Sequence, residues 1–271
     1  MAWNSILCAY SGDAARGSGL RHAIRVAKHH NAHLTGVLRH GTSRVQMRLT
    51  PHLPQELIDQ LDRVDQAHVS DIKERFTAAI EADGIAGNAE FVEILPSRDG
   101  DLPEFAHAYD LIVMGTHSDE AQDAHLSPHP DLVSLRSGRP VMVVPNGYEG
   151  EGLAERAIVA WDGARAATRA LSDTVEVLAE KEAVKIVSVS KEPRGTDRLM
   201  KNLSRHGVNA SFAVVERSGS IAETLLAEAA SFDAKLLVLG AFEHSKFSHD
   251  LFGGVTTEVI AKTNIPVLMS H

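Results

Sequence analysis

Three glycines flank the stretch of this chain whose residue types and spacing are best suited to binding a ligand. Gly240 follows the apolar run 236–239, and the pair Gly253-Gly254 precedes the helix-like run 255–262. Backbone N–H groups can approach a ligand closely at glycine, and a helix that begins after Gly254 points its free N–H groups and positive dipole end at that ligand. The pattern predicts a phosphate site. The alternative is a strand-to-helix loop that needs glycine only to turn.

Metal ligation and nucleophilic catalysis have weaker support in the sequence. His244, His249 and Asp250 are potential ligands, but they share one loop and no second-shell partner can be named, so we favour a solvated loop and predict no metal site. The histidines of the first half, including His29-His30 and His33, show no ligand spacing and are expected at the surface.

Catalysis is not indicated either, and no catalytic residue is assigned. The single cysteine, Cys8, lies in a predicted strand, where a small core residue is more common than a nucleophile. The sequence contains no Gly-x4-Gly-Lys-[Ser/Thr] motif, and no spacing suggests a nucleophile with its base. Enzymatic activity therefore stays an open question, with slow ATP hydrolysis as its upper limit.

The elements that would position these residues occur twice. Three segments of the first half recur in the second: 6–12 as 157–163, 110–115 as 235–240, and 139–144 as 265–269. We therefore predict one fold duplicated, with domains at 1–147 and 153–271. The short glycine-rich linker between them predicts that the halves pack as a pseudo-twofold pair within the chain.

Each half alternates short apolar runs with helical patterns, which indicates parallel strands joined by helical crossovers. The predicted strands are 5–10, 33–38, 90–95, 111–114, 141–144, 156–161, 184–189, 211–216, 236–239 and 266–269. The expected fold class is α/β, with two tandem doubly wound five-stranded parallel-sheet domains of Rossmann-like type. Ligands bind such sheets beyond the carboxyl ends of the strands, and both Asp162 and Gly240 stand at such ends.

Three local features carry further expectations. The segment 55–82 predicts a long amphipathic helix. Its predicted inward residues are Leu57, Leu61, Val64 and Phe76. Ser220 and Glu223 form a capping-box pattern before the helix 221–230. The polar, proline-containing segment 39–54 is expected to be a mobile surface loop.

Composition limits the partners. The formal charge of −9 gives no general attraction to nucleic acid or to an anionic membrane, so neither is predicted as a partner. The charge is about −7 over 1–150 and −2 over 151–271, which makes the second half the better host for an anion. One cysteine, no signal-peptide pattern and no apolar run near 18 residues predict a cytoplasmic protein.

These residues point to a family. Over nearly its whole length the chain resembles a tandem universal stress protein. The turn Asp162-Gly163 is similar to the family's Asp-Gly-Ser start. Nucleotide-binding members carry Gly-x2-Gly-x9-Gly-[Ser/Thr] after the fourth strand; here Gly240 and Gly253 match, whereas Glu243 and Gly254 depart. The variant ending Gly-Gly-Val-Thr resembles a subgroup of tandem bacterial members.

The resemblance implies an adenine nucleotide alpha hydrolase-like fold and a site for ATP or another adenine nucleotide, with or without Mg²⁺. By that resemblance Asp162 would meet the adenine or its ribose side. The backbone near Val189 would hold the adenine edge, and Gly240, Gly253 and Gly254 would cradle the phosphates.

The first half departs further from the family pattern. Ser11 stands in place of the aspartate, and Pro130-Asp131 replaces the glycine pair at the helix start. Proline removes one N–H, and the carboxylate would repel an anion. We therefore expect a degenerate first copy and at most one nucleotide per chain.

Two functions remain open. The preferred hypothesis is a stress-response protein that binds an adenine nucleotide in its second domain. The rival is a scaffold or interaction protein of the same fold that binds no nucleotide. Glu243 is the residue that favours the rival, because a carboxylate 4 Å from a phosphate charge costs roughly 4 kcal/mol at an effective dielectric near 20. A homodimer of the whole chain is an additional option.

Overall fold

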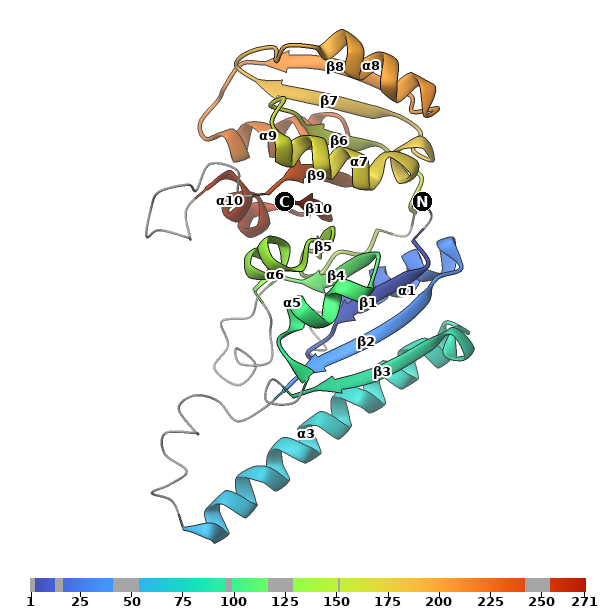
Figure 1. Ribbon diagram of the computed structural model, residues 1–271, viewed down its shortest axis with the longest axis vertical. Coiled ribbons are helices and arrows are strands. Elements are labelled where there is room, and N and C mark those ends of the chain that lie inside the picture. The colour runs from blue at the N-terminus through green and yellow to red at the C-terminus, as the bar shows by residue number, and fades with distance from the viewer. Residues whose placement is uncertain are drawn as a thin grey trace.

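The computed structural model describes residues 3–12, 17–40, 54–95, 99–116, 129–150, 152–241 and 254–271 (Figure 1). The elements of the first half are β1 (Ser5–Ala9), α1 (Ser18–His30), β2 (His33–Arg39), α3 (Gln55–Ala82), β3 (Ala89–Ile94), α5 (Leu102–Phe105), β4 (Leu111–Gly115), α6 (Pro130–Ser137) and β5 (Val141–Val144). Those of the second half are β6 (Ala157–Ala160), α7 (Arg165–Ala179), β7 (Val184–Val189), α8 (Thr196–Arg205), β8 (Ala210–Val215), α9 (Ile221–Ser231), β9 (Leu236–Gly240), α10 (Val255–Lys262) and β10 (Val267–Ser270).

All ten strands form one sheet, in the order β3-β2-β1-β4-β5-β10-β9-β6-β7-β8. Within each half the neighbouring strands are parallel and the order is the same, so the predicted α/β class and the duplication are confirmed. The halves meet where β5 pairs antiparallel with β10, with Met142 opposite Leu268. Figure 1 shows this seam at the middle of the molecule, and the predicted intramolecular pair is therefore confirmed.

Helices cover both faces of the sheet. Apolar side chains of α1, α3, α7 and α8 pack on one face, and those of α5, α6, α9 and α10 pack on the other. Strands covered on both faces consist of consecutive apolar residues, as in the four buried residues of β5. Cys8 is fully buried in β1, and burial raises the pKa of its thiol to about 12, which fits the predicted core role.

The predicted capping box is present at the start of α9. The Ser220 hydroxyl accepts a hydrogen bond from the Glu223 N–H at 3.0 Å, and the Glu223 carboxylate accepts one from the Ser220 N–H at 3.0 Å. Two N–H groups that the helix itself cannot satisfy are thereby paired.

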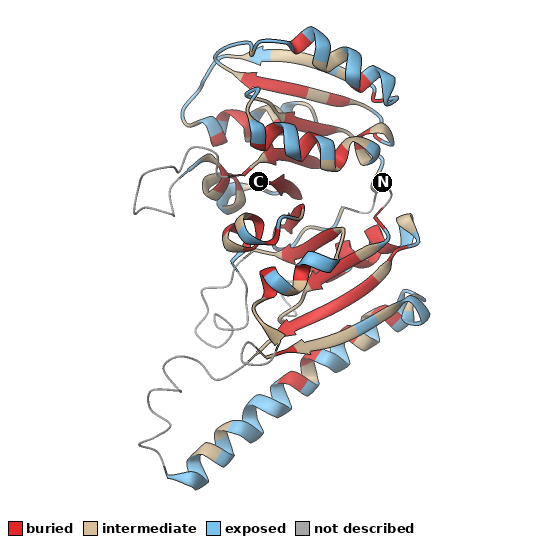
Figure 2. Ribbon diagram, in the orientation of Figure 1, coloured by how far each residue is buried: buried red, intermediate tan, exposed pale blue. Residues whose placement is uncertain are grey.

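The predicted inward face of α3 is wrong at its N-terminal half. Leu57 is 40% exposed and Val64 is 67% exposed. The buried residues of α3 are Val69, Ile72, Phe76 and Ile80. Figure 2 shows the reason: the first half of α3 extends past the sheet, so no described element covers it. No described helix combines the length and the apolar character needed to cross a membrane. The predicted mobile loop lies mostly at 41–53, outside the described residues.

Candidate functional site

A cavity of about 270 Å³ opens where β6, β7 and β9 end. Strand order reverses between β6 and β9, and the starts of α7, α9 and α10 complete the walls, so the cavity occupies the position where doubly wound sheets bind ligands. Its lining residues are Ala160, Trp161, Asp162, Ala166, Ala167, Val187, Val189, Lys191, Pro193, Ile221, Leu225, Leu239, Gly240, Val255 and Thr256. The structure thus brings together three of the five predicted site residues: Asp162, Val189 and Gly240.

Asp162 is held in place by a local turn. Its carboxylate accepts a hydrogen bond from the Ala164 N–H at 2.9 Å, just before α7 begins. Gly163 between them has φ +78°, a left-handed conformation that glycine adopts without strain. Asp162 is exposed and lines the cavity, so its carboxylate has capacity left to accept a hydrogen bond from a hydroxyl group.

The backbone of Val189 faces the cavity, because β7 extends beyond the end of its neighbour β6. The Trp161 N–H donates to the Val187 carbonyl at 2.8 Å on the β6 side, and the Ser190 N–H donates to Val215 at 2.8 Å on the β8 side. Backbone groups alternate sides along a strand, so those of Val189 face the β6 side. The β6–β7 register ends at Ala160 opposite Val187, so Val189 lies beyond the paired part of the strand.

Gly240 has a packing role that the sequence did not reveal. A Cβ atom there would lie 2.3 Å from the Ala167 N and 2.4 Å from the Ala166 carbonyl carbon, both in the backbone of α7. The absence of a side chain therefore lets α7 start directly against the end of β9. Close helix-to-strand packing is sufficient to explain this glycine.

Gly254 is the N-cap of α10 and has extended backbone with φ −176°. A Cβ atom at this position would meet nothing within 4 Å among the described residues. The Glu258 N–H donates to the Gly254 carbonyl, so the N–H groups of 255–257 lie ahead of the helical ladder. Gly253, Glu243 and the predicted loop histidines lie outside the described residues.

Glu258 places a carboxylate in the first turn of α10, but neighbours neutralise it. The Lys262 ammonium donates to it at 2.7 Å and the Ser220 hydroxyl at 2.8 Å. The hydrogen bond from Lys262, followed by that from Ser220, lowers the pKa of Glu258. The charge is thus engaged along the helix rather than free at its start.

Sequence reasoning missed two cavity residues. Lys191 follows the end of β7 by two residues and brings an exposed cation to the lining; its position just after a predicted strand was the available signal. The Trp161 indole N–H is buried and finds no acceptor in the described part of the chain. A buried donor without an acceptor is costly, so a ligand acceptor within its reach would be favourable.

Two positions of the first half that correspond to residues of this cavity carry charged side chains. Arg39 pairs with Ile94 as Val189 pairs with Val215, so Arg39 is its counterpart. Its guanidinium binds the Asp101 carboxylate at 3.0 Å.

The helix start of the first half also carries a charged residue where the second half has an uncharged one. Asp131 is the second residue of α6, as Thr256 is of α10, and Pro130 precedes it. The expected alignment of Pro130-Asp131 with the glycine pair is therefore wrong, because Gly254 is the N-cap of α10 and its counterpart in α6 is His129. On the opposite side Ile72 of α3 packs against the Gly12 turn: a Cβ on Gly12 would lie 2.2 Å from its Cγ1.

Comparison with known proteins agrees with this architecture. The universal stress protein family matches residues 2–145 and 191–271. The chain belongs to the universal stress protein family. The unmatched segment contains β6, α7 and β7, which repeat the β1-α1-β2 order. A search of curated proteins found no match.

Three solved structures match over nearly the whole chain. A universal stress protein from Archaeoglobus fulgidus DSM 4304 superposes with a TM-score of 0.70 at 18% identity, covering 100% of this chain and 96% of that one. A protein from Pseudomonas aeruginosa UCBPP-PA14 assigned to the universal stress proteins gives 0.59 at 15% identity, with 99% and 93% covered. A protein of unknown function from P. aeruginosa PAO1 gives 0.57 at 14% identity, with 99% and 92% covered. These likenesses establish the tandem fold.

Proposed function

We propose that this universal stress protein binds one adenine nucleotide per chain, in its second half. The observation that carries the proposal is the cavity at the ends of β6, β7 and β9, which gathers Asp162, Val189 and Gly240. Gly254, the N-cap of α10, and Gly253, which precedes it in the sequence, complete the proposed set of contacts.

The lining suits a flat apolar ring with a polar edge. Most of the cavity residues are apolar, and Asp162, Lys191 and Thr256 are the polar exceptions. Small-molecule sites commonly show this combination, at volumes of about 300 Å³ and more. In the proposed pose the adenine lies in the cavity with its edge on the Val189 backbone. The ribose hydroxyls donate to Asp162.

The phosphates would extend from the cavity toward α10. Thr256 and Val255 line both the cavity and the first turn of this helix, whose N–H groups favour an anion. Lys191 adds a cation on the lining, and Glu258 is engaged by Lys262. Mg²⁺ bound with the nucleotide would supply further positive charge for the phosphates.

One site per chain follows from the differences between the halves. In the first half the counterpart of Val189 is Arg39, whose charge is paired with Asp101. Asp131 stands at the helix position held by Thr256 in the second half. A carboxylate there would repel a phosphate, so the first half serves as a structural partner.

Calorimetry with Mg²⁺ and ATP tests the proposal. Wild type should bind one equivalent. Thr256→Asp copies the first-half residue, and at 4 Å from a phosphate charge its carboxylate would cost roughly 4 kcal/mol, or about a thousandfold in affinity. The reciprocal change Asp131→Thr is the matched control and should leave binding unaltered. Gly254→Ala has room for its methyl group, so weaker binding by this variant would report backbone contact with phosphate.

Three results would refute the proposal. They are two equivalents per chain, loss of binding in Asp131→Thr but not in Thr256→Asp, and no heat at millimolar ATP. The last of these would favour the scaffold function. As an independent check, protein purified without added ligand should release an adenine nucleotide on denaturation.

A further inference from the structure

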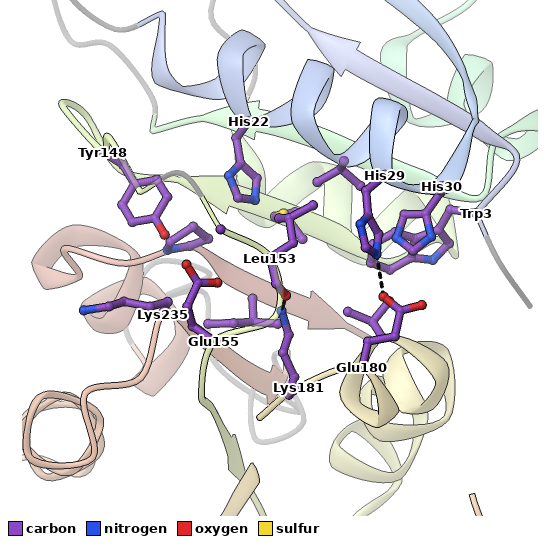
Figure 3. Close-up of a pocket in the computed structure, with 16 residues that line it drawn as sticks. Trp3, His22, His29, His30, Tyr148, Leu153, Glu155, Glu180, Lys181 and Lys235 are labelled. Carbon is purple, nitrogen blue, oxygen red and sulfur yellow. Dashed lines mark hydrogen bonds and ion pairs between the residues drawn. The ribbon is translucent and has the colours of Figure 1, made fainter. Parts of the chain in front are cut away.

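A second group of chemically competent side chains lies between the two halves, away from the nucleotide cavity. Figure 3 shows a small cavity, of about 30 Å³, lined by residues of both halves. At one end of it His29 and His30, from the last turn of α1, approach Glu180, the C-cap residue of α7.

The three side chains are close enough to share one ion. The His29 Nε2 and the Glu180 Oε2 are 2.6 Å apart. One ligand atom from each of His29, His30 and Glu180 lies within 4.8 Å of the other two. The rings of His29 and His30 are edge-to-face with centroids 4.9 Å apart, and Trp3 packs edge-on against His30 at 5.2 Å.

We propose that His29, His30 and Glu180 bind a first-row divalent transition-metal cation, with Zn²⁺ the best fit, and that the ion links the two halves. Tetrahedral Zn²⁺ with ligand distances of about 2.0–2.1 Å holds its ligand atoms roughly 3.3 Å apart. The 2.6 Å contact would therefore open slightly and the wider separations would close. Both His29 and Glu180 have the freedom to do so, because their side chains are 41% and 48% exposed.

The ligand types select this class of metal. Two imidazoles and one carboxylate suit zinc, nickel, cobalt or copper, whereas Mg²⁺ and Ca²⁺ prefer all-oxygen sites. Three protein ligands leave the fourth position for water.

Helix ends add to the preference for a cation. The carbonyl end of α1 carries His29 and His30, and the carbonyl end of α7 carries Glu180, so two negative dipole ends meet at this point. A glutamate at a helix C-terminus is unfavourable by itself, and the last turn of α7 contains no basic residue. A bound cation would offset this repulsion.

Lys181 is the nearby charge that opposes metal binding. Its ammonium is turned away, because it donates to the Leu153 carbonyl (Figure 3). The Glu155 carboxylate also acts on it electrostatically. The Glu180 carboxylate also attracts Lys181, less strongly than Glu155 does, while the Lys181 ammonium itself donates to the Leu153 carbonyl.

The plain alternative is a hydrogen-bonded ion pair between His29 and Glu180. The chain offers a matched control for this alternative: His33 and Glu90 form a similar pair, with 3.6 Å between nitrogen and oxygen. No third ligand joins that pair among the clusters found in the described residues.

The test uses the full chain without a histidine tag, stripped with a chelator and titrated with ZnCl₂ by calorimetry. Wild type should bind one equivalent of Zn²⁺ that Glu180→Gln and His29→Gln bind at least about tenfold more weakly. His33→Gln should match wild type. Glu180→Gln keeps the side-chain size and a hydrogen-bonding oxygen, so it should fold normally.

Two further measurements distinguish a shared site from surface binding. Zn²⁺ should raise the thermal midpoint of wild type and of His33→Gln, because the ion joins the halves, and should leave Glu180→Gln unchanged. Co²⁺ in place of Zn²⁺ should give the visible absorption of a low-coordinate site in wild type and in His33→Gln but not in Glu180→Gln. Equal Zn²⁺ affinity and stoichiometry in wild type and Glu180→Gln would overturn the proposal. The outcome does not bear on the nucleotide proposal, since none of these residues lines the proposed nucleotide cavity.

Discussion

Protonation of His22 should destabilise this protein as the pH falls below about 6.5. The His22 side chain is only 4% exposed, and its Nδ1 has no hydrogen-bond partner within the described part of the chain. It stacks edge-on against Tyr148, with ring centroids 5.7 Å apart (Figure 3). Burial first, then the charges of Arg25 and Lys181, lower its pKa from 6.5 to about 3.

The sign and size follow from linkage. The unfolded chain takes up a proton on His22 near pH 6.5, whereas the folded chain resists it until about pH 3. The contribution to stability is therefore complete above pH 6.5 and is lost as the pH falls toward 3. Between pH 8 and pH 5 the free energy of unfolding should fall by about 2 kcal/mol on account of His22. Down to about pH 3 the fall approaches ~5 kcal/mol, at 1.36 kcal/mol per pKa unit.

Chemical denaturation at pH 8 and pH 5 measures this loss. His22→Phe keeps an aromatic ring against Tyr148 and cannot titrate, so its drop in unfolding free energy between the two pH values should be smaller than that of wild type by about 2 kcal/mol. His33→Gln, which removes a half-exposed histidine, should retain the wild-type drop to within a few tenths of a kcal/mol. An identical pH dependence of wild type and His22→Phe would refute the reasoning. His22→Gln repeats the test with a polar residue, and in the folded wild type the His22 ring resonances should stay unshifted from pH 8 to pH 5.

Three other expectations concern stability and can be checked by the same denaturation assay. Gly240→Ala should lower the free energy of unfolding by about 1–3 kcal/mol, because its methyl group meets the α7 backbone. In Gly115→Ala the methyl group meets nothing within 4 Å, so the loss should be less than about 1 kcal/mol. Equal losses in the two variants would contradict the packing role of Gly240. Phe76→Ala should lower the free energy of unfolding by about 3–5 kcal/mol because Phe76 is fully buried, and Val64→Ser by less than about 0.5 kcal/mol because Val64 is exposed. A large loss from Val64→Ser would mean that another surface covers this part of α3. Ser220→Ala removes the α9 cap and should cost about 1 kcal/mol; no change would show that the capping box is dispensable.

Much of the fold could be predicted from the apolar periodicity of the sequence and from the glycines and prolines at the ends of its elements. The helices 55–82 and 255–262 have the predicted bounds, because glycine or proline lies close to both ends of each. The duplication and the short glycine-rich linker also predicted that the two halves pack on each other. Periodicity alone could not predict the exposure of Val64, because an amphipathic stripe does not reveal whether another element covers it.

The candidate sites were readable only in part. Asp162, Val189 and Gly240 follow strands, and parallel strands bring their carboxyl ends together, so their meeting was predictable. The approach of His29 to Glu180 was not, because it joins residues 151 positions apart through the docking of two halves. The same docking buries His22, which contradicts the expectation that the first-half histidines lie at the surface.

The antiparallel seam between β5 and β10 changes how this protein responds to dilution. Separate single-domain subunits joined along such strands would dissociate once their concentration fell below the dissociation constant. Here the partner edge is tethered by a short linker, which corresponds to an effective concentration of about millimolar at any protein concentration. The shared sheet should therefore persist at nanomolar protein. The two halves can also differ freely in sequence, so one can keep a ligand cavity while the other serves as its structural support.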